Sequence, residues 1–328
     1  MSNKIRSKST NSVFLTGGLG NQIFQLAAGL NFAIAEDLIL ETSNWKSHFS
    51  GTDIPEISDY ILPANVSFGR NSHMFLLKRK LINLIIRSGA LIEDGNKWNS
   101  FWKTSKSFAS YILRLCYFRQ FNIISPNGVG FDDSLRLDTR NCILIGYFQS
   151  NLWLSENSLL RYLKNLKLKD ITVQIEELRK LSIIEKPLIL HVRLGDYRVE
   201  RKVGIPSSNY YENSVTELWS TGKYNKIWIF TDDQNSASNI IPAWIVKNGR
   251  WINIDNGRAS SNLEAMRLGH GYVISNSTFS WWGAFLSYKK NPTVIAPQPW
   301  FRSKTEPNSI VPKGWIRRNA WNSINFEA

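Results

Sequence analysis

The chain has 328 residues, of which 43% are hydrophobic and 20% charged; this composition suffices for a buried core and excludes a disordered protein. Its two cysteines and four histidines follow no disulfide or zinc-binding spacing, so we expect no metal site. The net charge of +14 admits a nucleic acid, an anionic membrane or an anionic small substrate as partner. Nucleic acid ranks last, because no recognition helix, zinc finger or RNA-binding signature is visible.

The first residues, MSNKIRSKST, are polar and basic, and we predict no signal peptide. No apolar run reaches the roughly 18 residues of a membrane-spanning helix, so we expect a cytoplasmic protein. The segment 74–92, MFLLKRKLINLIIRSGALI, mixes basic and apolar residues. It fits a peripheral contact with the inner face of an anionic membrane, and equally a core helix with a solvated basic edge.

Strand-like and helix-like runs alternate along the chain, which predicts an α/β fold with parallel sheets. In the first part we predict strands at 12–16, 37–42 and 142–147, and helices at 21–35, 74–88, 104–118 and 156–166. The stretch 166–187 reads mostly as a helix and ends at Pro187. Later strands are expected from 188 and at 226–233, 251–254, 272–275 and 293–297. We therefore predict two Rossmann-like domains, residues 1–185 and 186–328.

A glycine turn opens the first predicted helix. Gly18 and Gly20 supply half of a dinucleotide fingerprint, but Ile23 occupies the place of the third small residue, which argues against NAD. The glycines would let backbone approach a ligand, with Asn21 and Gln22 at the helix N-terminus. The alternative is a plain turn with a side-chain cap at Asn21.

The sequence HVRLGDY (191–197) ends an apolar strand, where open α/β sheets bind ligands. Arg193 suits phosphate oxygens, and Asp196 or His191 is a candidate general base. The alternative is a structural ion pair between Arg193 and Asp196.

Two further strand ends carry polar groups. Asp232 and Asp233 are suited to ribose hydroxyls or a nucleobase edge, or to capping a helix. Asn276, Ser277 and Thr278 stand before a predicted helix and suit a diphosphate, with a simple cap as the alternative. No Asp-x-Asp triplet occurs, so the usual handle for a metal-bound diphosphate is absent.

The motifs GGLGNQIFQLAAG, HVRLGDY and NSTFSWWGAFL, in this order, resemble those of glycosyltransferase family 11, especially bacterial α-1,2-fucosyltransferases. The resemblance implies a GT-B-type fold with two Rossmann-like domains facing a cleft. It also implies GDP-fucose as donor, inversion at the anomeric carbon, and no required metal or cofactor. The first domain would be the acceptor side and the second would bind the GDP-sugar.

The resemblance also implies roles for single residues. Arg193 would stabilise the departing GDP. We expect Asp196 to be the general base because it shares a loop with Arg193, with His191 or an acid of the first domain as alternatives. Asn21 and Gln22 would face the acceptor or the cleft. The expected donor-binding residues are Ser277, Thr278, Phe279, Asn276, Asp232, Gly18 and Gly20.

Two positions depart from the family pattern. Leu194 replaces a second arginine, and Asn262 replaces an acid, with Glu264 nearby. We expect transfer of fucose to a galactose-type hydroxyl, in α-1,2 linkage, on a surface-polysaccharide or lipid-linked O-antigen glycan. The alternative, favoured by Leu194 and Asn262, is a non-catalytic glycan- or nucleotide-binding protein on the same scaffold.

Overall fold

The computed structural model describes residues 10–32, 37–42, 54–69, 123–126, 129–132, 135, 141–154 and 156–321. The chain forms two compact units. The first comprises Met1–Leu163 with Pro307–Ile310, and the second comprises Lys164–Glu306 with Val311–Ala328. The predicted helices at 74–88 and 104–118 and the basic segment 74–92 lie outside the described residues.

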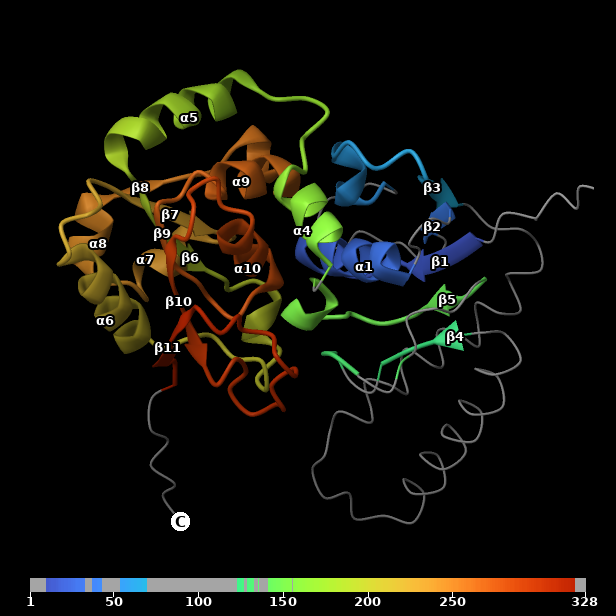
Figure 1. The fold of residues 1–328 in the computed structure, drawn as a ribbon. Coiled ribbons are helices and arrows are strands. Elements are labelled where there is room, and N and C mark those ends of the chain that lie inside the picture. Colours follow the sequence, from blue (N-terminus) through green and yellow to red (C-terminus); the bar gives the residue numbers. More distant parts are fainter. Residues whose placement is uncertain are drawn as a thin grey trace, which may run out of the picture. The chain divides into compact units, whose positions relative to one another are not determined.

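The first unit is built on a parallel sheet with the strand order β3-β2-β1-β5-β4 (Figure 1). Its strands are β1 (Thr10–Phe14), β2 (Asp37–Glu41), β3 (Val66–Gly69), β4 (Ile123–Ile124) and β5 (Ile143–Leu144). Helix α1 (Leu19–Phe32) follows β1 and is almost entirely buried. The 3-10 helices η1 (Glu56–Asp59) and η2 (Asn151–Leu154) and helix α4 (Asn157–Lys164) complete the described elements.

The second unit holds a six-stranded parallel sheet with the order β11-β10-β9-β6-β7-β8. Its strands are β6 (Leu188–Val192), β7 (Ile227–Thr231), β8 (Gly249–Trp251), β9 (Gly271–Val273), β10 (Thr293–Gln298) and β11 (Ile316–Asn319). Its helices are α5 (Val173–Glu185), α6 (Ser208–Trp219), α7 (Gln234–Ser238), α8 (Ala243–Asn248), α9 (Ala259–Met266) and α10 (Thr278–Phe285), with the 3-10 helices η3 (Asp196–Arg198) and η4 (Asp255–Gly257).

The strand order creates a switch point in each sheet. In the second unit the chain runs outward from β6 to β7 and β8, and then returns to add β9, β10 and β11 on the other side. The crevice at the carboxyl ends of β6 and β9 is therefore where an open α/β sheet binds its ligand. In the first unit β1 and β5 flank the corresponding point.

Apolar sequence explains the central strands. All five residues of β6 are buried, as expected for a parallel strand covered on both faces. Trp281 and Trp282 are fully buried in α10, which confirms that this pair packs the helix. The predicted fold class, α/β with two parallel-sheet units of the GT-B kind, is confirmed.

The boundary between the units differs from the predicted one at 185/186. Helix α5 belongs to the second unit, because Arg179 on α5 forms an ion pair with Glu264 on α9. The preceding segment is held there too, since the buried Arg267 donates to the carbonyl oxygens of Leu166 and Lys164. The stretch before Pro187, predicted mostly as a helix at the end of the first domain, thus packs as part of the second unit.

No helix within the described residues is sufficiently long and apolar to cross a membrane.

Candidate functional site

The switch point of the second sheet is marked by a hydrogen bond between two strand ends. The His191 Nδ1 atom on β6 lies 2.9 Å from the Ser275 Oγ atom after β9. His191 is buried, and burial, with a smaller contribution from the positive charge of Arg193, lowers its pKa to about 3. The imidazole is therefore neutral near pH 7, and its basicity is far below that of an efficient general base.

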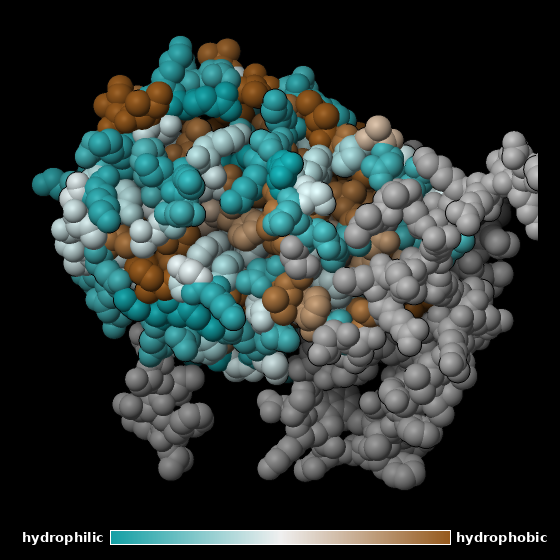
Figure 2. Space-filling model, in the orientation of Figure 1, coloured by the Kyte–Doolittle hydropathy of each residue, from teal (hydrophilic) through white to brown (hydrophobic). Residues whose placement is uncertain are grey.

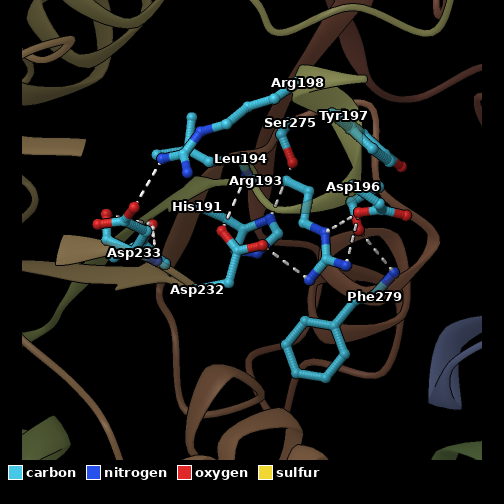
Figure 3. A network of polar contacts seen from close by, with 12 residues as sticks. His191, Arg193, Leu194, Asp196, Tyr197, Arg198, Asp232, Asp233, Ser275 and Phe279 are labelled. Carbon is cyan, nitrogen blue, oxygen red and sulfur yellow. Dashed lines mark hydrogen bonds and ion pairs between the residues drawn. The ribbon is translucent and has the colours of Figure 1, made fainter. Parts of the chain in front are cut away.

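Arg193 leaves the end of β6 and lies between two carboxylates (Figure 3). Its Nε and Nη2 atoms donate to Asp196 Oδ1 at 3.1 and 2.8 Å. Its Nη1 atom lies 3.1 Å from Asp232 Oδ2. The ion pair between Arg193 and Asp196, named above as the structural alternative, is present. It is accessible rather than buried, because the Asp196 side chain is 43% exposed.

Asp232 also fixes the backbone of this loop. Its Oδ1 atom accepts a hydrogen bond from the Leu194 N–H at 2.9 Å. A Cβ atom on Gly195 would lie 2.5 Å from Asp232 Oδ2, so a larger residue there would displace the Asp232 carboxylate. The Leu194 side chain is fully buried in the core of the unit. At the position of the family's second arginine, this chain therefore offers a backbone N–H to Asp232 and an apolar side chain to the core.

Asp233 caps the following helix. Its side chain accepts from the Ser236 N–H at 3.0 Å and pairs with Arg198 at 2.6 Å. The hydrogen bond from Arg198 and those from Ser236 lower its pKa to about 2. Of the two alternatives for the aspartate pair, Asp233 therefore follows the capping one, and Asp232 is the residue that contacts Arg193.

The N-terminus of α10 lies beside His191. Ser277 is the N-cap and accepts from the Phe279 N–H at 3.3 Å. The rings of Phe279 and His191 are 5.8 Å apart between centroids. Thr278 and Phe279 are partly exposed, so this helix end is open to a ligand. Its first N–H groups lack helical acceptors and favour an anion.

Asn276 has a different place from the one expected of a donor-binding side chain. It is buried, and its Nδ2 atom donates to the carbonyl oxygens of Val203 and Gly204 at 2.9 and 3.1 Å. The backbone carbonyl oxygen of Asn276 accepts a hydrogen bond from the Tyr197 hydroxyl at 3.1 Å. Asn276 thus ties the loop that follows Arg193 to the start of α10.

The glycine loop of the first unit is shaped by a residue that the sequence analysis missed. Gly17 has φ of +73°, and a Cβ atom there would lie 2.3 Å from Asn21 Nδ2. Gly18 has open space around it, whereas Gly20 is buried in the first turn of α1. Each glycine of TGGLGNQ was a candidate for the left-handed position of the turn, but only Gly18 and Gly20 were considered.

The two polar residues of this loop behave differently. Asn21 is partly exposed, and its Oδ1 atom accepts from Gln149 Nε2 at 2.9 Å. Gln22 is fully buried and is bonded to the Gly17 carbonyl, the Ile57 N–H and the Glu56 carboxylate. Asn21 can therefore meet a ligand, whereas the contacts of Gln22 support the loop.

Asn262, which stands where the family pattern has an acid, is held by contacts to the backbone of its own unit. Asn262 bonds through its side chain to both the N–H and the carbonyl of Ile254. Glu264 is buried and paired with Arg267 at 2.8 Å. Within the described residues no group of three or more His, Cys, Asp or Glu side chains could hold a metal ion; independence from metal stays a prediction.

Two parallel α/β units, with an arginine and an open helix end at the switch point of the second sheet, suit a protein that binds an anionic ligand. The chain belongs to glycosyltransferase family 11, whose family model, described as Glycosyl transferase family 11, matches residues 133–319.

Two curated relatives and one solved structure illustrate the similarity. The chain is 25% identical to alpha-1,2-colitosyltransferase of Escherichia coli over 317 residues, covering 92% of this chain and 97% of the relative. It is 28% identical to the O-antigen biosynthesis glycosyltransferase WbnK of Escherichia coli over 134 residues, covering 39% and 43%. Fucosyltransferase NodZ from Bradyrhizobium aligns with a TM-score of 0.45 and 14% identity, covering 85% of this chain and 94% of that one.

Proposed function

We propose that this glycosyltransferase moves fucose from GDP-fucose to a galactose-type hydroxyl, in α-1,2 linkage, on an O-antigen or other surface glycan. The observation that carries the proposal is Arg193, held by Asp232 and Asp196 at the switch point. The open N-terminus of α10 supplies a second group suited to phosphate. In this proposal the second unit binds the donor diphosphate, the glycine backbone of the first unit can approach the donor, and Asn21 belongs to the acceptor side.

The two edges of the Arg193 guanidinium suit different partners. Asp232 holds the Nη1 atom, and because it also holds the Leu194 N–H, it stays in place. Asp196 takes the Nε and Nη2 atoms, and its side chain is the more exposed of the two. We propose that a donor phosphate replaces Asp196 on this edge, in the bidentate geometry that arginine offers to phosphate.

This exchange provides both a cation for the leaving GDP and a base for the acceptor hydroxyl. As the bond between the fucose anomeric carbon and the phosphate oxygen breaks, its electron pair passes to GDP, and Arg193 stabilises the growing charge. Asp196, released from its cation, accepts the proton of the acceptor hydroxyl as that oxygen bonds to the anomeric carbon from the opposite face. His191, neutral and weakly basic, positions Ser275 and Phe279 rather than taking the proton.

A second donor sugar is a candidate because of a relative that this chain resembles. One relative that this chain matches along nearly its full length is an α-1,2-colitosyltransferase. Colitose is fucose without its 3-hydroxyl, so one donor pocket can fit both sugars and discriminate through contacts to that hydroxyl. The second candidate function is therefore α-1,2 transfer of colitose from its GDP-sugar.

The deciding experiment supplies GDP-fucose, GDP-colitose, GDP-mannose and UDP-galactose separately, with a β-galactoside acceptor. Turnover with GDP-fucose, and a product that NMR shows linked to galactose O2, is the expected result. Preference for GDP-colitose would select the second candidate. Binding of GDP-fucose without any product, across a panel of galactosides, would favour the non-catalytic protein. Retention of activity in EDTA is expected, because no metal is required in this proposal.

The peripheral membrane contact stays a prediction. It rests on the basic segment 74–92. Sedimentation with anionic vesicles at low salt is expected, and a protein that remains in the supernatant would contradict it.

A further inference from the structure

The second unit contains a cavity of about 600 Å³ that the proposed reaction does not use. It lies against α5 and α9, and its wall includes His270, which precedes β9. The His270 N–H donates to the carbonyl of Pro187, just before β6. The cavity therefore lies at the amino ends of the strands, whereas Arg193 and Ser275 follow their carboxyl ends.

One side of the cavity is a cluster of paired charges. Glu264 is 3% exposed and pairs with Arg267 at 2.8 Å and with Arg179 at 3.3 Å. The Tyr288 hydroxyl also donates to Glu264, and the Tyr288 ring lies over the Arg267 guanidinium at 4.3 Å. The Glu264 carboxylate, the acidic member of the cavity lining, is thus neutralised within the protein. Arg179 forms a second ion pair with Glu176, at 2.8 Å, through its Nη1 atom.

The remaining charges of the wall are positive. Lys167 and Lys289 line the cavity together with Arg179. His270 adds no negative charge, and its pKa is lowered, mainly by burial and also by Lys289 and Lys186. With Glu264 as the acidic member, the lining has an excess of positive charge. Arg179 has five N–H groups, of which contacts to Glu176 and Glu264 use two, so its fork can also bind an oxyanion.

The rest of the wall is apolar and partly open to solvent. Ile171 and Ile183 are 45% and 72% exposed, whereas Leu168 and Leu268 are buried at the same cavity. Figure 2 shows apolar side chains at the surface over α5, among hydrophilic ones. Exposed isoleucines beside a cationic cavity suit a ligand with an apolar chain and an anionic end.

We propose that this cavity is a second ligand site that binds an amphiphilic anion, such as a phosphate monoester with an alkyl chain. The anionic end pairs with Arg179, Lys167 and Lys289, and the chain covers Ile171 and Ile183. A volume of about 600 Å³ falls within the range of small-molecule sites. The site is independent of the donor site, because it occupies the opposite edge of the sheet.

The test is calorimetric titration of the full chain with octyl phosphate below its micelle concentration, with inorganic phosphate and octanol as its separate halves. We expect saturable binding of one octyl phosphate, and much weaker binding of either half. Arg179→Ala is expected to weaken binding about tenfold or more, since it removes a charge-assisted contact. Ile183→Ser should weaken it by about tenfold through lost apolar burial.

Lys180→Ala is the matched control, because Lys180 is an exposed cation on the same helix outside the cavity lining. It should leave binding unchanged. Circular dichroism checks that each variant is folded; Arg179→Ala keeps the contacts of Glu264 with Arg267 and Tyr288. Absence of saturable binding, or equal loss in Lys180→Ala and Arg179→Ala, would overturn the proposal. GDP affinity measured on the same variants separates this result from any failure of the donor site.

Discussion

Replacing Arg193 perturbs the reaction at the point where the leaving charge develops. Arg193→Ala removes the donors that now meet Asp196 and Asp232. Loss of one preorganised donor to a developing negative charge lowers kcat by about 10²–10³, or roughly 3–4 kcal/mol. Arg193→Lys keeps the charge but not the two-atom edge, so we expect a smaller loss, about tenfold or more.

The fold should survive this change. The Arg193 side chain is 23% exposed and its two partners 43% and 24%, and such ion pairs contribute about 0–1 kcal/mol each. Asp232 also keeps its hydrogen bond from the Leu194 N–H. We therefore expect the free energy of unfolding to fall by no more than about 2 kcal/mol.

The assay measures GDP release from GDP-fucose with a galactoside acceptor, together with GDP affinity and Tm. Arg198→Ala is the matched control: it removes a cation from the same loop, but one that pairs with the capping Asp233. Arg193→Ala with near-normal kcat would refute the assigned role. So would an equal loss in Arg198→Ala, because a general loss of positive charge would then explain both variants.

Further predictions concern the loops and the reaction conditions. Gly17→Ala should lower stability by about 1–3 kcal/mol in thermal unfolding, because its φ is +73° and its Cβ would meet Asn21. Asn21→Ala should lower turnover while GDP affinity stays unchanged. Full turnover in this variant would show that the loop is a plain turn without a part in the reaction. Asp233 has a lowered pKa, so its ionised form contributes stability that is fully present above pH 3.8. This contribution is lost as the pH falls toward about 2. Asp233→Asn should therefore flatten the pH dependence of Tm in that range. EDTA should leave kcat unchanged; loss that Mg²⁺ restores would contradict metal independence.

The sequence predicts the central strands well, because their burial shows directly in residue type. Strand β6 is an uninterrupted apolar run that is buried throughout. Strands β3, β4 and β11 were not predicted: β4 has two residues, and β3 (VSFG) and β11 (IRRN) have partly exposed side chains. Edge strands depend on a neighbour for their pairing and carry little hydrophobic signal of their own.

The sequence predicts which strand ends the candidate site residues follow, but not the contacts that they make. Because ligands bind at strand carboxyl ends in open α/β sheets, we expected Arg193, Asp232 and Ser277 at one edge of the second sheet. That Asp232 bonds to Arg193 and to the Leu194 N–H depends on β7 lying beside β6 in the sheet, and local sequence does not encode this adjacency. For the same reason Asn276, which stands beside Ser277 in sequence, turned out to hold the loop at Val203.

The most direct test of the central claim is a thermal-shift panel of GDP, GDP-fucose, GDP-mannose, UDP-galactose and CMP-sialic acid on the wild type and Arg193→Ala. A ligand that binds only the folded protein raises Tm according to its concentration and affinity. The account predicts a selective rise with GDP and GDP-fucose in the wild type, reduced in Arg193→Ala. A rise with UDP-galactose or CMP-sialic acid alone, or an unchanged GDP shift in Arg193→Ala, would contradict a GDP-sugar site at this arginine.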